Sequence, residues 1–140
     1  MKLWKGDTYE LTRRYAGHKD FVTTLAIAPD GRSIASAGLD GSIRIWSALS
    51  RSTRQRLYGH EGRVSGLSFA PGGGWLASAG ADGKVRLWDL KRGRAARVLP
   101  GSMGHQTAVA FSPDGTRIAA ASADGKVRFW AAPGQAVASQ

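Results

Sequence analysis

The sequence predicts an all-β protein that is built from repeated four-stranded antiparallel sheets. The prediction depends on a fixed internal period, on short strand-like runs within each period, and on turn residues between those runs. Tryptophan recurs every 42 residues, at Trp4, Trp46, Trp88 and Trp130. An Asp-Gly pair keeps the same step, at residues 40–41, 82–83 and 124–125. A fixed period of this length indicates stacked copies of one supersecondary unit.

Each repeat contains short runs of Val, Ile, Leu, Phe and Ala, without a helix-period stretch of useful length. In the second repeat these runs cover residues 64–70, 75–80, 84–90 and 96–99. Pro-Asp-Gly at 29–31 and 113–115 predicts the first hairpin turn of a repeat, because it combines a fixed φ with a positive one. The Asp-Gly pair predicts the second hairpin turn. Each repeat is therefore expected to fold as a four-stranded sheet.

The first run of each repeat alternates large and small side chains. In the second repeat, Leu67 and Phe69 alternate with Gly66 and Ser68. Residues two apart share a face of a strand, so one face of the sheet is bulky and the other is small. Such a sheet can stack on a copy of itself, large face against small face, which favours a radial arrangement of sheets.

The composition limits the classes of partner and chemistry. The chain has 140 residues, with 20 Lys and Arg against 10 Asp and Glu, which gives a net charge of +10. This charge admits nucleic acid, an acidic protein or a lipid headgroup surface as partners, and names none of them. The absence of cysteine excludes disulfides and thiol chemistry. No apolar run suits a signal peptide or a membrane span, so we expect no membrane association and a cytoplasmic location.

Three strings, GH…SIASAGLDGSIRIWS, GH…WLASAGADGKVRLWD and IAAASADGKVRFWA, resemble the WD-repeat (Trp-Asp repeat) family over essentially the whole chain. The resemblance implies a β-propeller of four-stranded blades, with about three blades in this chain. In that family a His, a Ser or Thr, an Asp and a Trp form a hydrogen-bonded brace within each blade. The matching residues are His18, Ser36, Asp40 and Trp46 in the first repeat, and His60, Ser78, Asp82 and Trp88 in the second.

The same residue types could suggest a hydrolytic triad, but the set is repeated and no strand-to-helix nucleophile elbow accompanies it. A buried indole N–H and hydroxyl need acceptors, and a buried carboxylate needs donors, so the four groups satisfy one another. We therefore expect a scaffold rather than an enzyme, with no cofactor. A metal site is not expected either, because His18 and His60 belong to separate blades.

The third repeat departs from this pattern. Ala120 stands where the bracing Ser should be, while Asp124 and Trp130 are retained. The pair Gly104-His105 lies three residues out of register, and the true equivalents of Gly59-His60 are Gly101-Ser102. Without His and Ser, Asp124 is expected to bond backbone amides or water, and the third blade is expected to be the least stable.

The period divides the chain into a single partial propeller. Residues 1–16 form the end of a preceding blade, and the repeats cover 17–58, 59–100 and a truncated 101–140, with residues 135–140 entering a fourth strand. Propellers usually close with about 4 to 8 blades. We therefore expect an incomplete ring, completed either by other copies or by sequence missing from this chain, as in a fragment of a longer WD-repeat protein.

Copies that join head to tail would close a ring of six blades from two chains or nine from three. In such a ring one copy would contribute the strand near Leu11 to Tyr15, and this strand would complete the last blade of the next copy. This exchange fits the overhanging ends, and we favour it over the fragment.

The resemblance implies a platform that binds an unidentified protein or peptide. The candidate interaction face contains the residues before each first strand and before each turn Asp, namely Phe21, Arg63, His105, Leu39, Ala81 and Ala123. These positions vary against a constant framework. The variation is typical of a recognition surface and equally of loops that nothing constrains.

Arginines predict a basic outer rim. They recur two residues before each Trp and along the outer strands, at Arg44, Arg86, Arg128, Arg13, Arg14, Arg54, Arg56, Arg94 and Arg97. The rim either neutralises phosphates of a nucleic acid, or covers the edge strands with its aliphatic stems. We favour the second interpretation, because no aromatic residues interleave with the arginines as stacking platforms.

Overall fold

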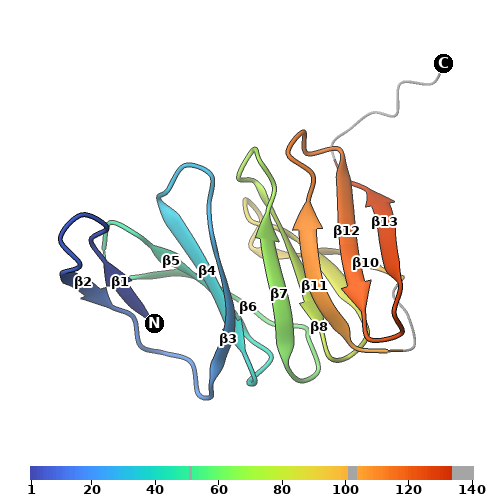
Figure 1. Ribbon diagram of the computed structural model, residues 1–140, viewed down its shortest axis with the longest axis horizontal. Helices are drawn as coiled ribbons and strands as arrows, with labels where there is room; N and C mark the ends of the chain where they lie inside the picture. The colour runs from blue at the N-terminus through green and yellow to red at the C-terminus, as the bar shows by residue number, and fades with distance from the viewer. Residues whose placement is uncertain (51, 101–103, 134–140) are drawn as a thin grey trace.

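The computed structural model describes residues 1–50, 52–100 and 104–133, which form strands joined by turns and loops (Figure 1). Within these ranges no helix occurs, so the predicted all-β class is confirmed. No helix of the described residues is long and apolar enough to cross a membrane.

The strands form four sheets, which we name the N-terminal hairpin and blades 1, 2 and 3. The N-terminal hairpin consists of β1 (Lys2–Trp4) and β2 (Leu11–Arg14). Blade 1 consists of β3 (Val22–Ile27), β4 (Ser33–Gly38), β5 (Ile43–Ser47) and β6 (Thr53–Leu57). Blade 2 consists of β7 (Val64–Phe69), β8 (Trp75–Gly80), β9 (Val85–Asp89) and β10 (Arg94–Leu99). Blade 3 consists of β11 (Gln106–Phe111), β12 (Arg117–Ser122) and β13 (Val127–Ala131).

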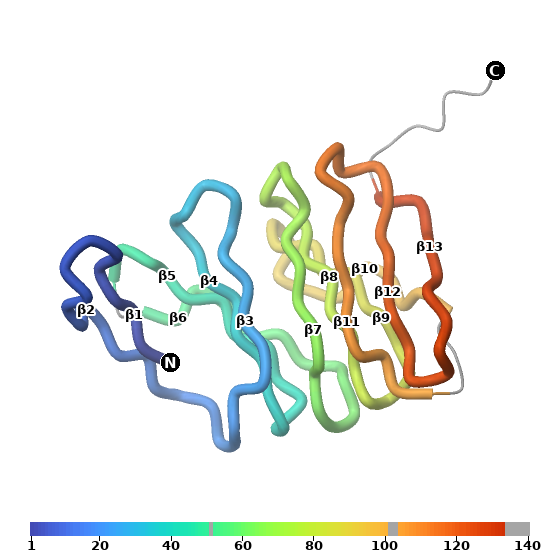
Figure 2. The backbone as a smooth tube through the Cα atoms, in the orientation of Figure 1, coloured from blue at the N-terminus to red at the C-terminus, as the bar shows by residue number. Residues whose placement is uncertain are grey.

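Each blade pairs its strands antiparallel in chain order, and the sheets stand side by side from the N-terminal hairpin to blade 3 (Figure 2). The first hairpin turn of every blade lies at the upper end in Figure 1, and the loops that lead into β3, β7 and β11 lie at the lower end. The expected fourth strand of blade 3, at residues 135–140, lies outside the described residues.

A β-bulge recurs at the start of each blade. The register between the first two strands skips one residue in each blade, and the skipped residues are Thr23, Ser65 and Thr107. A bulge of this kind leaves the extra residue out of the ladder and redirects its side chain. The three hydroxyls therefore take equivalent places at the lower end of the three blades.

The Asp-Gly turn of blade 1 contacts the backbone of blade 2. Gly41 has a φ of +71°, which an L side chain rarely adopts. A Cβ atom at Gly41 would also lie 2.8 Å from the carbonyl oxygen of His60. Both the turn and the close approach of the two blades therefore require glycine at this position.

The core lies between the blades. Ala35 and Ala37 of blade 1 are fully buried in one apolar cluster with Leu67 and Phe69 of blade 2. Ala77 and Ala79 of blade 2 are buried in a second cluster, with residues of blade 3 that include Ile118. Along the first two strands this arrangement agrees with the predicted stacking of a large face against a small one, while Ile43 and Ile45 of β5 add large side chains to the same face of blade 1. Such contacts remove apolar area from water, which favours folding by about 25 cal/mol for each Å².

The N-terminal hairpin covers only part of the face of blade 1 that points away from blade 2. Its residues Met1 and Leu3 pack with Tyr15, Ile34 and Trp46 in a third cluster. The part of that face formed by β3 is open, since Leu25 is 54% exposed and Ile27 is 61% exposed. Their counterparts in blade 2 are buried between two blades.

The opposite end of the stack is also apolar and open. Val127 and Phe129 of β13 are 58% and 66% exposed, although Ile43 and Ile45 hold the same register in blade 1 and are buried. The described stack therefore ends in two apolar faces, one on blade 1 and one on blade 3.

Candidate functional site

The brace of blade 1 brings together the four side chains that the period singles out. Trp46 Nε1 lies 2.7 Å from Ser36 Oγ, and Ser36 Oγ lies 2.8 Å from His18 Nε2. His18 Nδ1 lies 3.2 Å from a carboxylate oxygen of Asp40. The hydroxyl of Ser42 donates to the other carboxylate oxygen at 2.9 Å. The brace thus connects the loop before β3 with β4, β5 and the turn between them.

Blade 2 repeats the same geometry. Trp88 Nε1 donates to Ser78 Oγ at 2.8 Å, and Ser78 Oγ lies 2.6 Å from His60 Nε2. His60 Nδ1 lies 3.0 Å from Asp82 Oδ2. The side chains of Trp88 and Ser78 are almost completely buried. A buried hydroxyl that already bonds two partners is not accessible to a substrate.

The donors and acceptors give each brace a direction. An ionised carboxylate only accepts hydrogen bonds, so we assign the proton on the His60 ring to Nδ1, which donates to Asp82. His60 Nε2 then accepts the hydroxyl proton of Ser78, whose oxygen accepts the Trp88 N–H. The chain runs from indole to hydroxyl to imidazole to carboxylate and requires a neutral imidazole.

Electrostatics agree with this assignment. Burial lowers the pKa of His60 below its ordinary value, and the nearby Asp82 carboxylate opposes that shift without reversing it. Burial alone would raise the pKa of Asp82, but backbone N–H groups of Glu61 and Lys84 donate to it, and its pKa falls. Asp40 behaves likewise, because hydrogen bonds from Ser42 and others outweigh its burial and lower its pKa.

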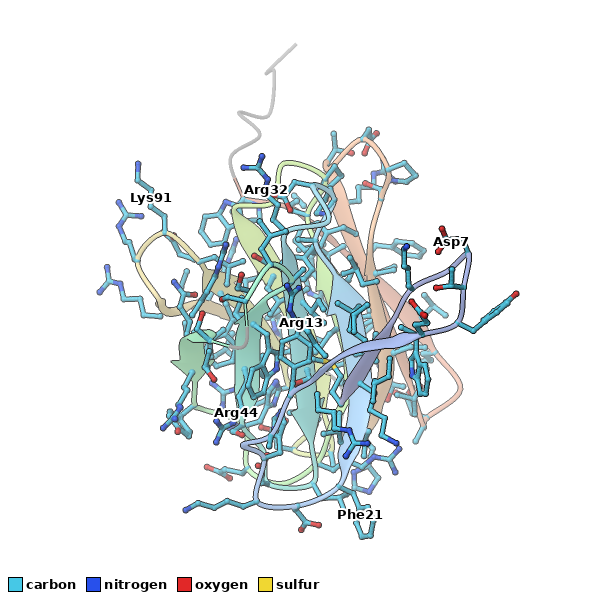
Figure 3. The ribbon with its side chains drawn as sticks, turned by 90° about the vertical axis from the view of Figure 1, so that its left-hand side faces the viewer. Asp7, Arg13, Phe21, Arg32, Arg44 and Lys91 are labelled. Atoms are coloured by element: carbon cyan, nitrogen blue, oxygen red, sulfur yellow. The ribbon has the colours of Figure 1, made fainter. Side chains whose placement is uncertain are left out.

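Two arginines of the predicted outer rim lie inside the blades instead. Arg44 is 7% exposed, with its guanidinium carbon 5.8 Å from the centre of the Trp46 ring. Arg86 is nearly buried, and its Nη2 lies 3.8 Å from a carboxylate oxygen of Asp82. The prediction of a rim position for these two was wrong, because their strands lie inside the sheet and each guanidinium lies beside a brace. Figure 3 shows Arg44 near the lower end of the molecule.

The brace of blade 3 is different. Asp124 accepts the backbone N–H of Lys126 at 3.0 Å, as expected, and it also pairs with Arg128, whose Nη2 lies 2.8 Å away. The Arg128 hydrogen bond, with some opposition from burial, lowers the pKa of Asp124 to about 2. The Asp124 side chain is 29% exposed, against 4% for Asp82. Arg128 thus takes the place of the missing His and Ser at the surface.

A glycine of blade 2 makes room for the brace of that blade. A Cβ atom on Gly80 would collide with His60 Nδ1 and lie 2.7 Å from Asp82 Oδ1. In blade 3 the same register position is Ser122, whose hydroxyl donates to the carbonyl of His105 at 3.3 Å. A side chain fits there because the sequence of blade 3 has no histidine in that register.

The candidate interaction face lies at the lower end of the blades, where Figure 3 shows Phe21 projecting from the molecule. The structure joins its six residues in pairs by backbone hydrogen bonds, each across one blade. These bonds run from Leu39 N to Phe21 O, from Ala81 N to Arg63 O, and from Ala123 N to His105 O, at 2.8–2.9 Å. The two segments of each pair are therefore held at a fixed distance.

Four of these six residues line one cavity between blades 2 and 3. The cavity has a volume of about 350 Å³ and is lined by Arg63, Ser65, Ala81, His105, Thr107 and Ala123. Phe21 and Leu39 lie apart from it, at blade 1. His105 Nδ1 donates to the carbonyl oxygen of Ala81 at 2.6 Å and so connects the two blades.

Sequence reasoning missed the contribution of Arg44 and Arg86 to the braces, and it missed the three bulge hydroxyls. The signal for the arginines was present, since they share the 42-residue period with the brace residues. The bulge left no signal in residue type, because Thr and Ser are also ordinary strand residues. Among the described residues, no group of three or more His, Cys, Asp or Glu side chains is placed to hold a metal ion.

Comparisons with known proteins identify the same three repeats. The profile of the family described as "WD domain, G-beta repeat" matches residues 9–47, 51–89 and 94–131. Each matched segment ends one residue after a brace-position tryptophan, at Ser47, Asp89 and Ala131. The third repeat is thus matched in spite of its altered brace.

Several known proteins each match about one third of the chain. It is 40% identical over 47 residues to a periodic tryptophan protein 2 homolog of Dictyostelium discoideum, over 34% of this chain and 5% of that protein. It is 33% identical over 46 residues to the cross-pathway control WD-repeat protein 2 of Flammulina velutipes, over 33% of this chain and 15% of that protein. It is 35% identical over 46 residues to the small ribosomal subunit protein RACK1 of Caenorhabditis elegans, over 33% of this chain and 14% of that protein.

The matched stretches span a small part of each relative, so they bear on the repeat and not on the activity of the whole protein. The profile matches cover most of the chain, and the sheets, their register and the repeated brace agree with them. The chain belongs to the WD-repeat family of β-propeller proteins, as an incomplete propeller of three blades.

Proposed function

We propose that this chain is a non-catalytic scaffold for protein–protein interaction, and that copies of it join head to tail into a closed propeller ring. The non-catalytic role is supported by the brace, in which the Ser78 hydroxyl and the His60 imidazole are buried and bonded to each other. Rigid blades that present short, fixed loops at one end suit a binding platform.

The observation that carries the ring is the match between the two exposed end faces and the interface inside the chain. Ile43 and Ile45 lie buried in the cluster that joins blade 1 to blade 2. Val127 and Phe129 hold the same register in blade 3 and are exposed. Leu25 and Ile27 are exposed in the same way and correspond to the buried Leu67 and Phe69. Blade 3 of one copy can therefore pack on blade 1 of another through the contacts that blades 1 and 2 make.

The proposed ring also includes an exchange of strands, in which β2 of one copy pairs with β13 of another. In the N-terminal hairpin Lys2 pairs with Arg14, in the same register in which Arg44 pairs with Arg56 in blade 1. Arg128 of β13 stands in the position of Lys2. In the assembled ring β13 of one copy replaces β1 beside β2 of the next, so that Arg128 faces Arg14 and β2 completes blade 3.

The number of copies follows from the number of blades. Two copies give six blades and three copies give nine. Because propellers usually have about 4 to 8 blades, we favour the dimer.

Cysteine cross-linking tests the exchange, since the chain contains no cysteine of its own. The double variant Arg14→Cys/Arg128→Cys places thiols at facing positions of β2 and β13, within the reach of a disulfide. Oxidation is expected to give a covalent dimer on a non-reducing gel.

The matched control is Lys2→Cys/Arg14→Cys, which places the thiols at facing positions of β1 and β2. Its disulfide forms within one copy and holds β1 on β2, so this variant is expected to run as a monomer and to fail to assemble. An uncross-linked Arg14→Cys/Arg128→Cys protein would contradict the exchange and favour blades supplied by a longer polypeptide.

Binding of nucleic acid is the second candidate, favoured by the net charge and by the exposed arginines of β6 and β10. A pulldown repeated with nuclease and with raised salt separates the two candidates, because phosphate contacts weaken steeply with salt. Protein partners that survive both treatments support the scaffold. Loss of all partners with nuclease would favour the polyanion-binding module.

A further inference from the structure

Two small residues, Ala81 and Ala123, line the cavity between blades 2 and 3. Ala81 and Ala123 precede the turn Asp of their blades, where blade 1 has the larger Leu39. The cavity has a volume of about 350 Å³, which lies within the range of ligand-binding pockets. Both walls belong to blades of the same chain, so the cavity does not depend on ring closure.

The polar groups of the cavity come from the bulges and from the loop before β11. Ser65 and Thr107 are the extra residues of the bulges in β7 and β11. Thr107 Oγ1 donates its proton to the carbonyl of Ala121 at 3.2 Å, so its lone pairs can still accept. His105 Nδ1 donates to Ala81 O at 2.6 Å, which fixes the orientation of the ring.

The charge of the cavity is positive. Arg63 is exposed, and no acidic residue lines the cavity. The carboxylates of Asp82 and Asp124 in the adjoining turns are already engaged, because Asp82 bonds His60 and Asp124 bonds Arg128. Glu61, in the same loop as Arg63, is exposed and is not among the residues that line the cavity. A guanidinium in this setting prefers a planar carboxylate, which it can bind through two parallel N–H···O bonds.

We propose that this cavity binds an acidic peptide segment of a partner protein, with one Asp or Glu carboxylate at Arg63. The neighbouring small apolar side chain of the peptide lies over the methyl groups of Ala81 and Ala123. The proposal rests on the scaffold function and names the chemistry of its partner. The chain's net charge of +10 attracts such a segment from solution.

A peptide fits the site better than a nucleic acid does. The lining of the cavity includes a single arginine and two alanine methyl groups, whereas a nucleic acid would need several cations along its phosphates. The two methyl groups instead suit an aliphatic side chain next to the carboxylate.

The test uses a fluorescein-labelled ten-residue peptide of alternating Glu and Ala, and the same peptide with Gln for Glu. Fluorescence anisotropy is measured with the full chain. The acidic peptide is expected to bind, and Arg63→Gln is expected to weaken it by about tenfold or more, the usual loss for a hydrogen bond to a charged group. Ala123→Leu fills the cavity and is expected to weaken binding by a similar factor.

The control is Arg97→Gln, which removes the same charge from the outer strand β10 and is expected to change binding less than twofold. Equal losses in Arg63→Gln and Arg97→Gln would overturn the proposal in favour of bulk charge, as would equal binding of the Gln peptide. A single-stranded oligonucleotide that binds more tightly than the acidic peptide and is as sensitive to Arg63→Gln would overturn it in favour of nucleic acid.

Light scattering of each variant separates this proposal from the ring. Loss of peptide binding in Arg63→Gln with an unchanged mass supports the cavity alone. A peptide that binds a monomeric protein supports the cavity and contradicts only the ring.

Discussion

Gly80 lies against His60 so closely that a Cβ atom on the glycine would collide with the imidazole Nδ1. The brace of blade 2 therefore depends on the absence of a side chain as much as on the four groups that bond to one another. Blade 3 has Ser122 at this position and no histidine in that register. The two differences compensate each other.

The first prediction follows from this contact. Gly80→Ser is expected to displace His60 and to break the chain from Trp88 to Asp82, at a cost of about 2–3 kcal/mol in the free energy of unfolding. Urea denaturation checks the value. Ser122→Gly is the matched control and is expected to change stability by less than about 1 kcal/mol. Similar losses in both variants would contradict the steric account.

A second prediction concerns the central hydroxyl. Ser78→Ala leaves the Trp88 N–H without an acceptor and His60 Nε2 without a donor, and both groups are buried. We expect a loss of about 2–4 kcal/mol, since each unsatisfied buried group costs about 1–3 kcal/mol. Thermal unfolding measures it. The control is the reverse exchange in blade 3, Ala120→Ser. The explanation fails if Ser78→Ala unfolds at the same temperature as the wild type.

The third prediction is a pH dependence. Folding lowers the pKa of His60, so below about pH 6.5 the unfolded chain binds a proton that the folded chain does not. Stability is therefore expected to fall as the pH drops from 6.5 towards the folded pKa, by at most about 1.4 kcal/mol for each pH unit from this one group. Asp40 and Asp82 have lowered pKa values, so their contribution to the free energy of unfolding is retained until the pH falls below about 4.

Urea denaturation at pH 7.5, 6.5 and 5.5 measures this slope. His60→Asn, which has no titrating ring, is expected to lose stability overall and to show a flatter profile. Parallel profiles for the variant and the wild type would assign the slope to other groups.

The fourth prediction ranks the blades. Asp124 is held by an exposed ion pair, and the hydroxyl of the brace is replaced by Ala120, so blade 3 is expected to open more readily than blade 2. Amide hydrogen exchange is expected to be faster in β12 than in β8. Equal protection of the two strands would show that the brace adds little to blade stability.

The sequence predicted much of the fold, because the 42-residue period places Trp, Asp-Gly and the turn residues in fixed positions. It singled out the residues that the structure joins in the braces of blades 1 and 2, since their types recur in step. The burial of Arg44 and Arg86 was not predictable from residue type, because arginine is usually exposed and only the brace beside each one explains it. The cavity near Arg63 depends on two alanines and two bulges from different blades, which no local pattern reveals.

The ring is the central claim, and the mass of the chain in solution tests it most directly. Size-exclusion chromatography with light scattering is expected to give about twice the chain mass of 14.8 kDa. Phe129→Asp places a charge in the proposed interface and is expected to return the mass to that of one chain. A folded wild-type monomer at every concentration tested would contradict ring closure.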